Sequence, residues 1–151
     1  MRYYPISLDI RGKPVLVAGA GKVALRKTCA LLDAGAVVTV VAPEADPAFA
    51  ALPVRWHSRP WEPSDVPGHL LVFAATDQRE VNAHIAAEAK RLGIPANVAD
   101  APGECDFLVP ARIDLVDAQI AISTEGRNPR RAAALRRELE AFLGRPKVES
   151  E

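Results

Sequence analysis

The stretch GAGKVA at residues 19–24 carries the residue types whose spacing best suits a chemical task. Gly19, Gly21 and Ala24 follow the pattern G-x-G-x-x-A, whose third position needs only a small residue for close packing of a helix on a strand. The first glycine permits a sharp turn, and the second lacks the β-carbon that would keep a pyrophosphate from the N–H groups of a helix start. No aspartate, serine or threonine stands there as a cap, so a ligand anion can satisfy those donors.

The segments around this turn supply the context that the motif requires. The run VLVA at 15–18 predicts a strand buried on both faces, and apolar residues at helical spacing predict a helix over 23–34 that ends at Gly35. A second β-prone run at 36–43 completes a right-handed βαβ unit with parallel strands. The sequence therefore predicts a dinucleotide site, with a glycine-tight turn that binds no nucleotide as the alternative.

An acidic residue near the end of the second strand bears on the choice of cofactor. Such a residue usually binds the ribose hydroxyls, and Glu44 lies slightly beyond the usual place. No basic residue there can pair with a 2′-phosphate, so the sequence favours NAD over NADP.

The rest of the chain alternates between strand-like and helix-like segments. We expect a short outer strand within 54–61, a buried strand at 69–76, an amphipathic helix at 77–93 capped by Asp77, a strand at 94–100, a strand or hairpin over 111–124, a basic helix over 128–144 and a disordered tail at 145–151. This order predicts a Rossmann-like, doubly wound, mostly parallel α/β sheet with a C-terminal hairpin and helix. We expect a Rossmann domain over 1–112 and a short C-terminal segment over 113–151.

The composition indicates one globular domain. The 151 residues are 49% hydrophobic and 25% charged, and 19 basic residues balance 19 acidic ones, which gives no indication of nucleic-acid or membrane binding. The first residues lack the apolar core of a signal peptide, and no uninterrupted apolar run is long enough to span a membrane, so we expect a cytoplasmic protein. Cys29 and Cys105 are too few for a disulfide framework, and no zinc-binding spacing occurs.

Several separated motifs together resemble a known family: YYPISLDIRGKPVLVAGAGKVALRKTCALLDAGAVVTVVAPE, FAATDQREVN, NVADAPGECDFLVPA and IAISTEGRNPRRAAALRRELE. In order and spacing they resemble the precorrin-2 dehydrogenase family, the N-terminal module of siroheme synthases, over nearly all of residues 3–143. The resemblance implies NAD-dependent oxidation of precorrin-2 to sirohydrochlorin and, in some members, chelation of ferrous iron. It also implies a homodimer built through the C-terminal half, here the hairpin and helix at 113–143.

The resemblance assigns cofactor and catalytic residues one by one. The family's cofactor motif falls on Gly19, Gly21, Lys22, Val23, Pro43 and Glu44. The aspartate that closes the family's NV-x-D motif matches Asp100. From the carboxyl end of a strand, an aspartate can take a proton from the macrocycle or steer a metal. A loop aspartate that forms an Asx-type turn is the alternative for Asp100.

Further candidates each have a structural alternative. Asn97 is expected at the substrate or as an amide that satisfies loop backbone, and Thr76 beside the nicotinamide ribose or as a cap of the next helix. Thr124 is expected at the substrate; with Ser123 it matches a hydroxyl pair of the family in which one position can be phosphorylated, and a plain turn is the alternative. Arg127 is expected to meet a carboxylate of the substrate or to lie in solvent.

Arg130 and Arg131 share the two expectations stated for Arg127. Cys105 and Phe107, in the family-like sequence CDF, are expected to pack in the interior.

Relatives in this family normally continue with a further helical region that helps to shape the tetrapyrrole pocket, whereas this sequence stops at residue 151. We therefore expect a compact precorrin-2 dehydrogenase and leave chelation of iron open. The alternatives are an NAD-binding, non-catalytic or partner-dependent subunit and a redox-responsive NAD sensor. Asp100 and the CDF sequence favour the enzyme, because a pure cofactor sensor has no need of them.

Overall fold

The computed structural model describes residues 3–144, which form two compact units. One unit spans Ile6–Phe107, and the other joins the N-terminal residues up to Pro5 with the residues from Leu108 onward. The tail at 145–151, for which disorder is expected, lies outside the described residues.

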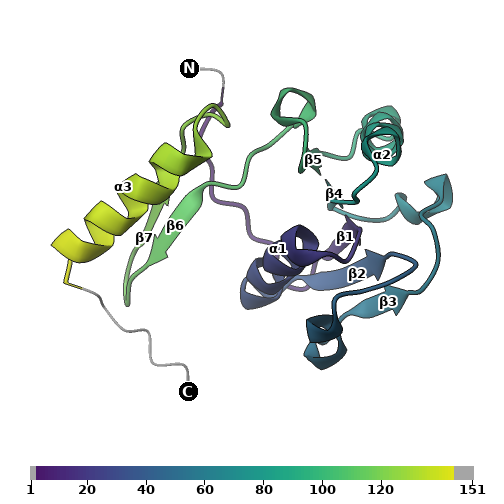
Figure 1. The fold of residues 1–151 in the computed structure, drawn as a ribbon, viewed down its shortest axis with the longest axis horizontal. Helices are drawn as coiled ribbons and strands as arrows, with labels where there is room; N and C mark the ends of the chain where they lie inside the picture. Colours follow the sequence, from purple (N-terminus) through teal and green to yellow (C-terminus); the bar gives the residue numbers. More distant parts are fainter. Residues whose placement is uncertain (1–2, 145–151) are drawn as a thin grey trace. The chain divides into compact units, whose positions relative to one another are not determined.

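A parallel five-stranded sheet forms the centre of the Ile6–Phe107 unit (Figure 1), in the order β3-β2-β1-β4-β5. Its strands are β1 (Pro14–Ala18), β2 (Val37–Val41), β3 (Arg55–His57), β4 (Leu71–Ala74) and β5 (Ala96–Val98). The predicted Rossmann-like, doubly wound sheet is confirmed, and the expected short outer strand is β3 at one edge.

Two of the connections between the parallel strands contain an α-helix. Helix α1 (Lys22–Asp33) joins β1 to β2, and α2 (Arg79–Arg91) joins β4 to β5. These crossovers run toward opposite edges, and right-handed crossovers of that kind place their helices on opposite faces. The strand order reverses between β1 and β4, so the ligand crevice is expected outside the carboxyl ends of these strands.

Apolar strands fill the centre of the unit. The last four residues of β1 and all four residues of β4 are buried, which is expected of strands covered on both faces. In the parallel register, Val17 of β1 lies between Val40 of β2 and Phe73 of β4.

Short 3-10 helices interrupt the connecting loops, namely η1 (Pro47–Ala51), η2 (Pro63–Asp65) and η3 (Pro102–Glu104).

The ends of α1 agree with the sequence, whereas the start of α2 does not. Gly21 is the N-cap of α1 and no side chain caps that helix, while Gly35 follows its end with φ of +79°. The prediction that Asp77 caps α2 is wrong, because the helix begins at Arg79 with Gln78 as N-cap and no side-chain cap. The hydroxyl of Thr76 instead accepts the Gln78 N–H at 3.2 Å.

The C-terminal unit contains an antiparallel hairpin and one helix. Strands β6 (Ala111–Asp114) and β7 (Gln119–Ile122) pair with each other. Of the two structures expected over residues 111–124, a single strand or a hairpin, the chain therefore forms the hairpin. Helix α3 (Pro129–Phe142) contacts both strands, and its N-cap is Asn128, whose side chain accepts the N–H of Arg131 at 2.9 Å. None of the helices within residues 3–144 has the length and apolar character needed to cross a bilayer.

Candidate functional site

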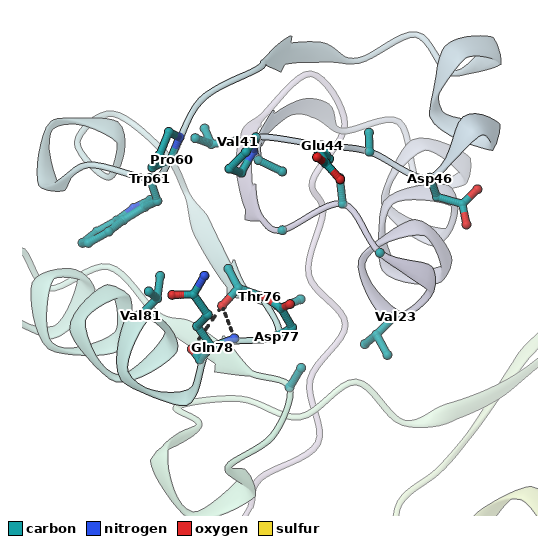
Figure 2. A pocket seen from close by; sticks show the side chains of 18 of the residues that line it. Val23, Val41, Glu44, Asp46, Pro60, Trp61, Thr76, Asp77, Gln78 and Val81 are labelled. Carbon is teal, nitrogen blue, oxygen red and sulfur yellow. Dashed lines mark hydrogen bonds between the residues drawn. The ribbon is translucent and has the colours of Figure 1, made fainter.

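An open pocket lies at the carboxyl ends of the parallel strands (Figure 2). The connections that follow all five strands of the sheet line it, together with the first turns of α1 and α2. Its lining includes every residue expected to hold the cofactor, namely Gly19, Gly21, Lys22, Val23, Pro43, Glu44 and Thr76, and also Asp100. The fold thus brings together residues that are separated by up to about 80 positions in the chain, at the place where doubly wound sheets bind ligands.

The two glycines of the turn differ in what the protein requires of them. Gly19 has φ of +102°, and a β-carbon there would lie 2.3 Å from the carbonyl oxygen of Ala75. The protein itself therefore requires glycine at this position. Gly21 has φ of −83°, and a β-carbon there would meet no atom within 4 Å. The space in front of Gly21 is open on the pocket side, as a bound pyrophosphate requires.

Charge around the pocket is unevenly distributed. Among its lining residues, Lys22 is the one lysine or arginine, and it stands at the first position of α1. A cation is unfavourable next to the positive end of a helix dipole unless an anion lies close by. The lining carboxylates are Glu44, Asp46, Asp77 and Asp100. One lysine beside bare N–H groups suits a pyrophosphate, and the carboxylates near the end of β2 disfavour the extra phosphate of NADP.

The two carboxylates after β2 have different surroundings. Asp46 caps η1, since its Oδ1 accepts the N–H of Ala48 at 3.0 Å. Its own N–H donates to the carbonyl of Ala20 at 2.9 Å, which ties this loop to the glycine turn. Glu44 is exposed and lines the pocket, so it is the carboxylate available to ribose hydroxyls.

Asp100 follows β5, and one of its oxygens is held from two sides. Its Oδ1 accepts hydrogen bonds of 3.1 Å from Arg79 Nη1 and of 3.1 Å from Asn82 Nδ2. Arg79 also pairs with Glu104. Within the described residues no partner is recorded for Asp100 Oδ2, and the side chain is 38% exposed. A carboxylate with one oxygen fixed and the other open to a pocket can bind or move a proton.

Asn97 is not among the residues that line the pocket. It is 4% exposed, its Oδ1 accepts from Lys27 Nζ at 2.8 Å, and its Nδ2 donates to the carbonyl of Phe107 at 3.0 Å. Burial lowers the pKa of the Lys27 ammonium, which also lies 5.3 Å from the centre of the Phe73 ring. These contacts agree with the alternative interpretation of Asn97 as an amide that satisfies loop backbone.

Cys105 is buried as expected, whereas Phe107 packs against the core and is only partly buried. The Phe107 ring meets Phe73 edge to face, with ring centres 5.4 Å apart. Cys105 is 4% exposed; its Sγ accepts the N–H of Val98 at 3.1 Å and donates to the Val98 carbonyl at 3.3 Å. Beside it, Asp106 makes two hydrogen bonds with the backbone of Ala96. Its Oδ2 accepts the Ala96 N–H at 3.0 Å, and its own N–H donates to the Ala96 carbonyl at 2.9 Å.

Cys105 is predicted to resist alkylation in the folded protein. Burial raises the pKa of its thiol, so a smaller fraction is the reactive thiolate at pH 8 than for an ordinary cysteine. Cys29 is only partly buried and serves as the internal control. Iodoacetamide labelling followed by peptide mass spectrometry should modify Cys29 at least about tenfold faster. Equal rates in the folded protein would contradict the prediction, and both thiols should react alike in urea.

Thr124 and Arg127 lie in the C-terminal unit, where they have local partners. The Thr124 hydroxyl donates to the carbonyl of Asn128 at 2.9 Å, and Ser123 Oγ accepts the N–H of Glu125 at 3.1 Å. Arg127 pairs with Glu125 at 2.7 Å. These contacts form the turn before α3, in which Glu125 has φ of +54°.

Several residues of the site escaped the sequence analysis. Trp61 and Val81 supply large apolar side chains on one side of the pocket, opposite Val23 in the view of Figure 2. Arg79 and Asn82 hold Asp100. From the sequence, Arg79 resembles an ordinary solvent-facing residue and Asn82 is one of several residues on the inner face of the helix, and only the packing of α2 beside β5 brings them to Asp100.

A family model described as "Putative NAD(P)-binding" matches residues 6–111, which include the whole pocket. The chain belongs to this NAD(P)-binding family. The expected cofactor, NAD, agrees with that description. Because the family spans the parallel sheet and both crossover helices, the glycine turn is part of a complete dinucleotide-binding fold.

Known proteins extend this result. The chain is 45% identical to siroheme synthase of Methylococcus capsulatus and 46% identical to siroheme synthase 1 of Aeromonas salmonicida, over 95% of its own length and 31% of theirs. It thus spans about a third of the length of these relatives. A solved structure, "SirC, precorrin-2 dehydrogenase", matches with a TM-score of 0.80 at 25% identity, over 93% of this chain and 71% of that one. The resemblance to the precorrin-2 dehydrogenase and siroheme synthase family is confirmed.

Proposed function

We propose that the chain is an NAD-dependent precorrin-2 dehydrogenase that forms sirohydrochlorin. The observation that carries this proposal is that a single pocket joins the uncapped glycine turn to Asp100. The NAD(P)-binding family and the precorrin-2 dehydrogenase of similar fold support it. A protein that only senses NAD would not need a carboxylate at this end of β5.

The residues of the pocket divide the work. When bound, NAD supplies the acceptor for the hydride that leaves the macrocycle. The N–H groups after Gly21, together with Lys22, hold the pyrophosphate, and Glu44 accepts hydrogen bonds from the adenosine ribose. The open oxygen of Asp100, Oδ2, takes up the proton that leaves the macrocycle. Precorrin-2 and NAD⁺ then yield sirohydrochlorin, NADH and one proton.

The proposal extends to the substrate contacts and the assembly. We assign Thr124 and Arg127 to the substrate's carboxylates, because a polycarboxylate needs cationic and hydroxyl partners. Asn97 remains a candidate only if its bond to Lys27 exchanges for one to the substrate. We further propose a cytoplasmic homodimer that pairs through residues 113–143.

The direct test mixes the purified protein with precorrin-2 and NAD and follows NADH absorbance. The expected result is NADH formation together with sirohydrochlorin, and slower turnover with NADP. Intact NADH binding without turnover would refute the dehydrogenase hypothesis and would favour the NAD-binding subunit or the NAD sensor. Loss of NADH binding itself would remove all three hypotheses.

The Gly21→Ser variant should separate cofactor binding from folding. A serine side chain would occupy the open space and cap the N–H groups that a pyrophosphate needs. Losing hydrogen bonds to a charged group should weaken NADH binding by about 10- to 100-fold. Serine is at least as good an N-cap as glycine, so the urea-unfolding midpoint should not fall. Unchanged NADH affinity by fluorescence titration would contradict the assignment.

A further inference from the structure

Asn82 in the first half of α2 is a fully buried polar side chain with an unusually complete set of bonds. Its exposed fraction is 0%, and four hydrogen bonds use its amide. Three of them go to Thr76 in the turn after β4, and the fourth goes to Asp100 after β5. One side chain therefore connects the turn expected at the cofactor to the carboxylate expected at the substrate.

The bonds to Thr76 determine which end of the amide faces Asp100. Asn82 Oδ1 accepts the Thr76 N–H at 3.0 Å and its hydroxyl at 2.7 Å, while Nδ2 donates to the Thr76 carbonyl at 3.1 Å. A flipped amide would set Oδ1 against that carbonyl and Nδ2 against the Thr76 N–H. The backbone of Thr76 thus fixes Nδ2, a donor, toward Asp100.

A second donor to the same oxygen provides a comparison. Arg79 Nη1 and Asn82 Nδ2 both lie 3.1 Å from Asp100 Oδ1. Arg79 is 43% exposed and is shared with Glu104, whereas Asn82 is excluded from water. An exposed ion pair restrains its partner weakly, while a hydrogen bond from a buried donor is costly to break, because the donor would be left without a partner. Asn82 therefore restrains Asp100 more firmly than Arg79 does.

We propose that Asn82 is a positioning residue: it fixes Asp100 Oδ1 relative to the Thr76 turn and so leaves Oδ2 aimed for proton uptake. The catalytic part of this inference rests on the proposed dehydrogenase function. The positional part concerns only the bond between the two side chains, which can be measured without turnover.

The positional part is tested by exchanging donor and acceptor. In Asn82→Asp at pH 8, two carboxylates face each other and the urea-unfolding midpoint should fall clearly. Asp100→Asn alone should change the midpoint little. The double variant Asn82→Asp with Asp100→Asn should recover a substantial part of the loss, because the amide introduced at position 100 can then donate to the carboxylate introduced at position 82. A double variant as unstable as Asn82→Asp would overturn the inference, since Asn82 would then serve Thr76 alone.

The catalytic part compares variants that each remove one donor from Asp100. Asn82→Ser should lower kcat by about 10- to 100-fold, because a displaced catalytic group costs this much. Its dissociation constant for NADH should stay within about threefold, and Arg79→Gln should lower kcat far less. Equal effects of the two substitutions, or a loss expressed only in NADH affinity, would overturn the catalytic role. If the wild-type chain forms no NADH, the proposed function is refuted. The exchange of donor and acceptor would still show whether Asn82 positions Asp100.

Discussion

Gly19→Ala is expected to be the most damaging single substitution in the glycine turn. The residue has φ of +102°, which L side chains rarely adopt, and the added β-carbon would lie 2.3 Å from the backbone oxygen of Ala75. Ala75 cannot move away easily, since its N–H bonds to the carbonyl of Ala18 at 2.8 Å between β1 and β4. Strain and displacement together should cost about 4 kcal/mol, a large part of the stability of a small domain.

Urea unfolding followed by circular dichroism measures this effect. Gly68→Ala is the matched control, because Gly68 also has positive φ, +84°, but a β-carbon there would meet no atom within 4 Å. The control should lose only the cost of the left-handed conformation, about 1–2 kcal/mol. Similar losses in the two variants would mean that the contact with Ala75 relaxes freely.

Asp100→Ala should lower kcat for NADH formation by about 10²- to 10⁴-fold, the usual contribution of a general base. The same change should leave the dissociation constant for NADH within about twofold, since the residues proposed to hold the cofactor are those of the glycine turn and Glu44, which also line the pocket. The expected pattern is therefore loss of turnover with retained binding, which stopped-flow absorbance and fluorescence titration measure separately.

Asp106→Asn is the matched control for this experiment. Asp106 lies in the same loop after β5, but it is outside the pocket lining and its Oδ2 accepts the N–H of Ala96 at 3.0 Å. The asparagine keeps an acceptor for this bond, so kcat should stay within about threefold of wild type. Equal rates of Asp100→Ala and wild type would remove Asp100 from its assigned role, and water would accept the proton.

The sequence predicts the glycine turn well because its determinants are local. β1, Gly19, Gly21 and α1 lie within 20 consecutive residues, and their order alone identifies a strand, a tight turn and an uncapped helix. The position of Glu44 follows from the strand that precedes it. Asp77 shows the limit of local reasoning, because it is a capping residue type in the expected place, yet α2 begins at Arg79 with Gln78 as N-cap and no side-chain cap.

The surroundings of Asp100 could not be predicted because they depend on tertiary contacts. Arg79 and Asn82 lie 21 and 18 residues before Asp100, and helix periodicity makes Asn82 one of several residues on the inner face of α2. Trp61 enters the pocket from an irregular loop with no periodic pattern. In both cases the side chains come together because separate elements of the fold pack against each other. No local sequence motif marks such packing.

The pairs of bonds that Cys105 and Asp106 make with β5 also determine where the sheet ends. Val98 and Ala96 turn their N–H and carbonyl groups away from β4, and the thiol of Cys105 together with the carboxylate and N–H of Asp106 occupies all four groups. An open edge of this kind can recruit a strand from another molecule, which is a common start of aggregation. The loop after Asp100 therefore covers the β5 edge of the sheet, where a sixth strand could otherwise pair. This cover protects the folded chain from edge-to-edge association at β5.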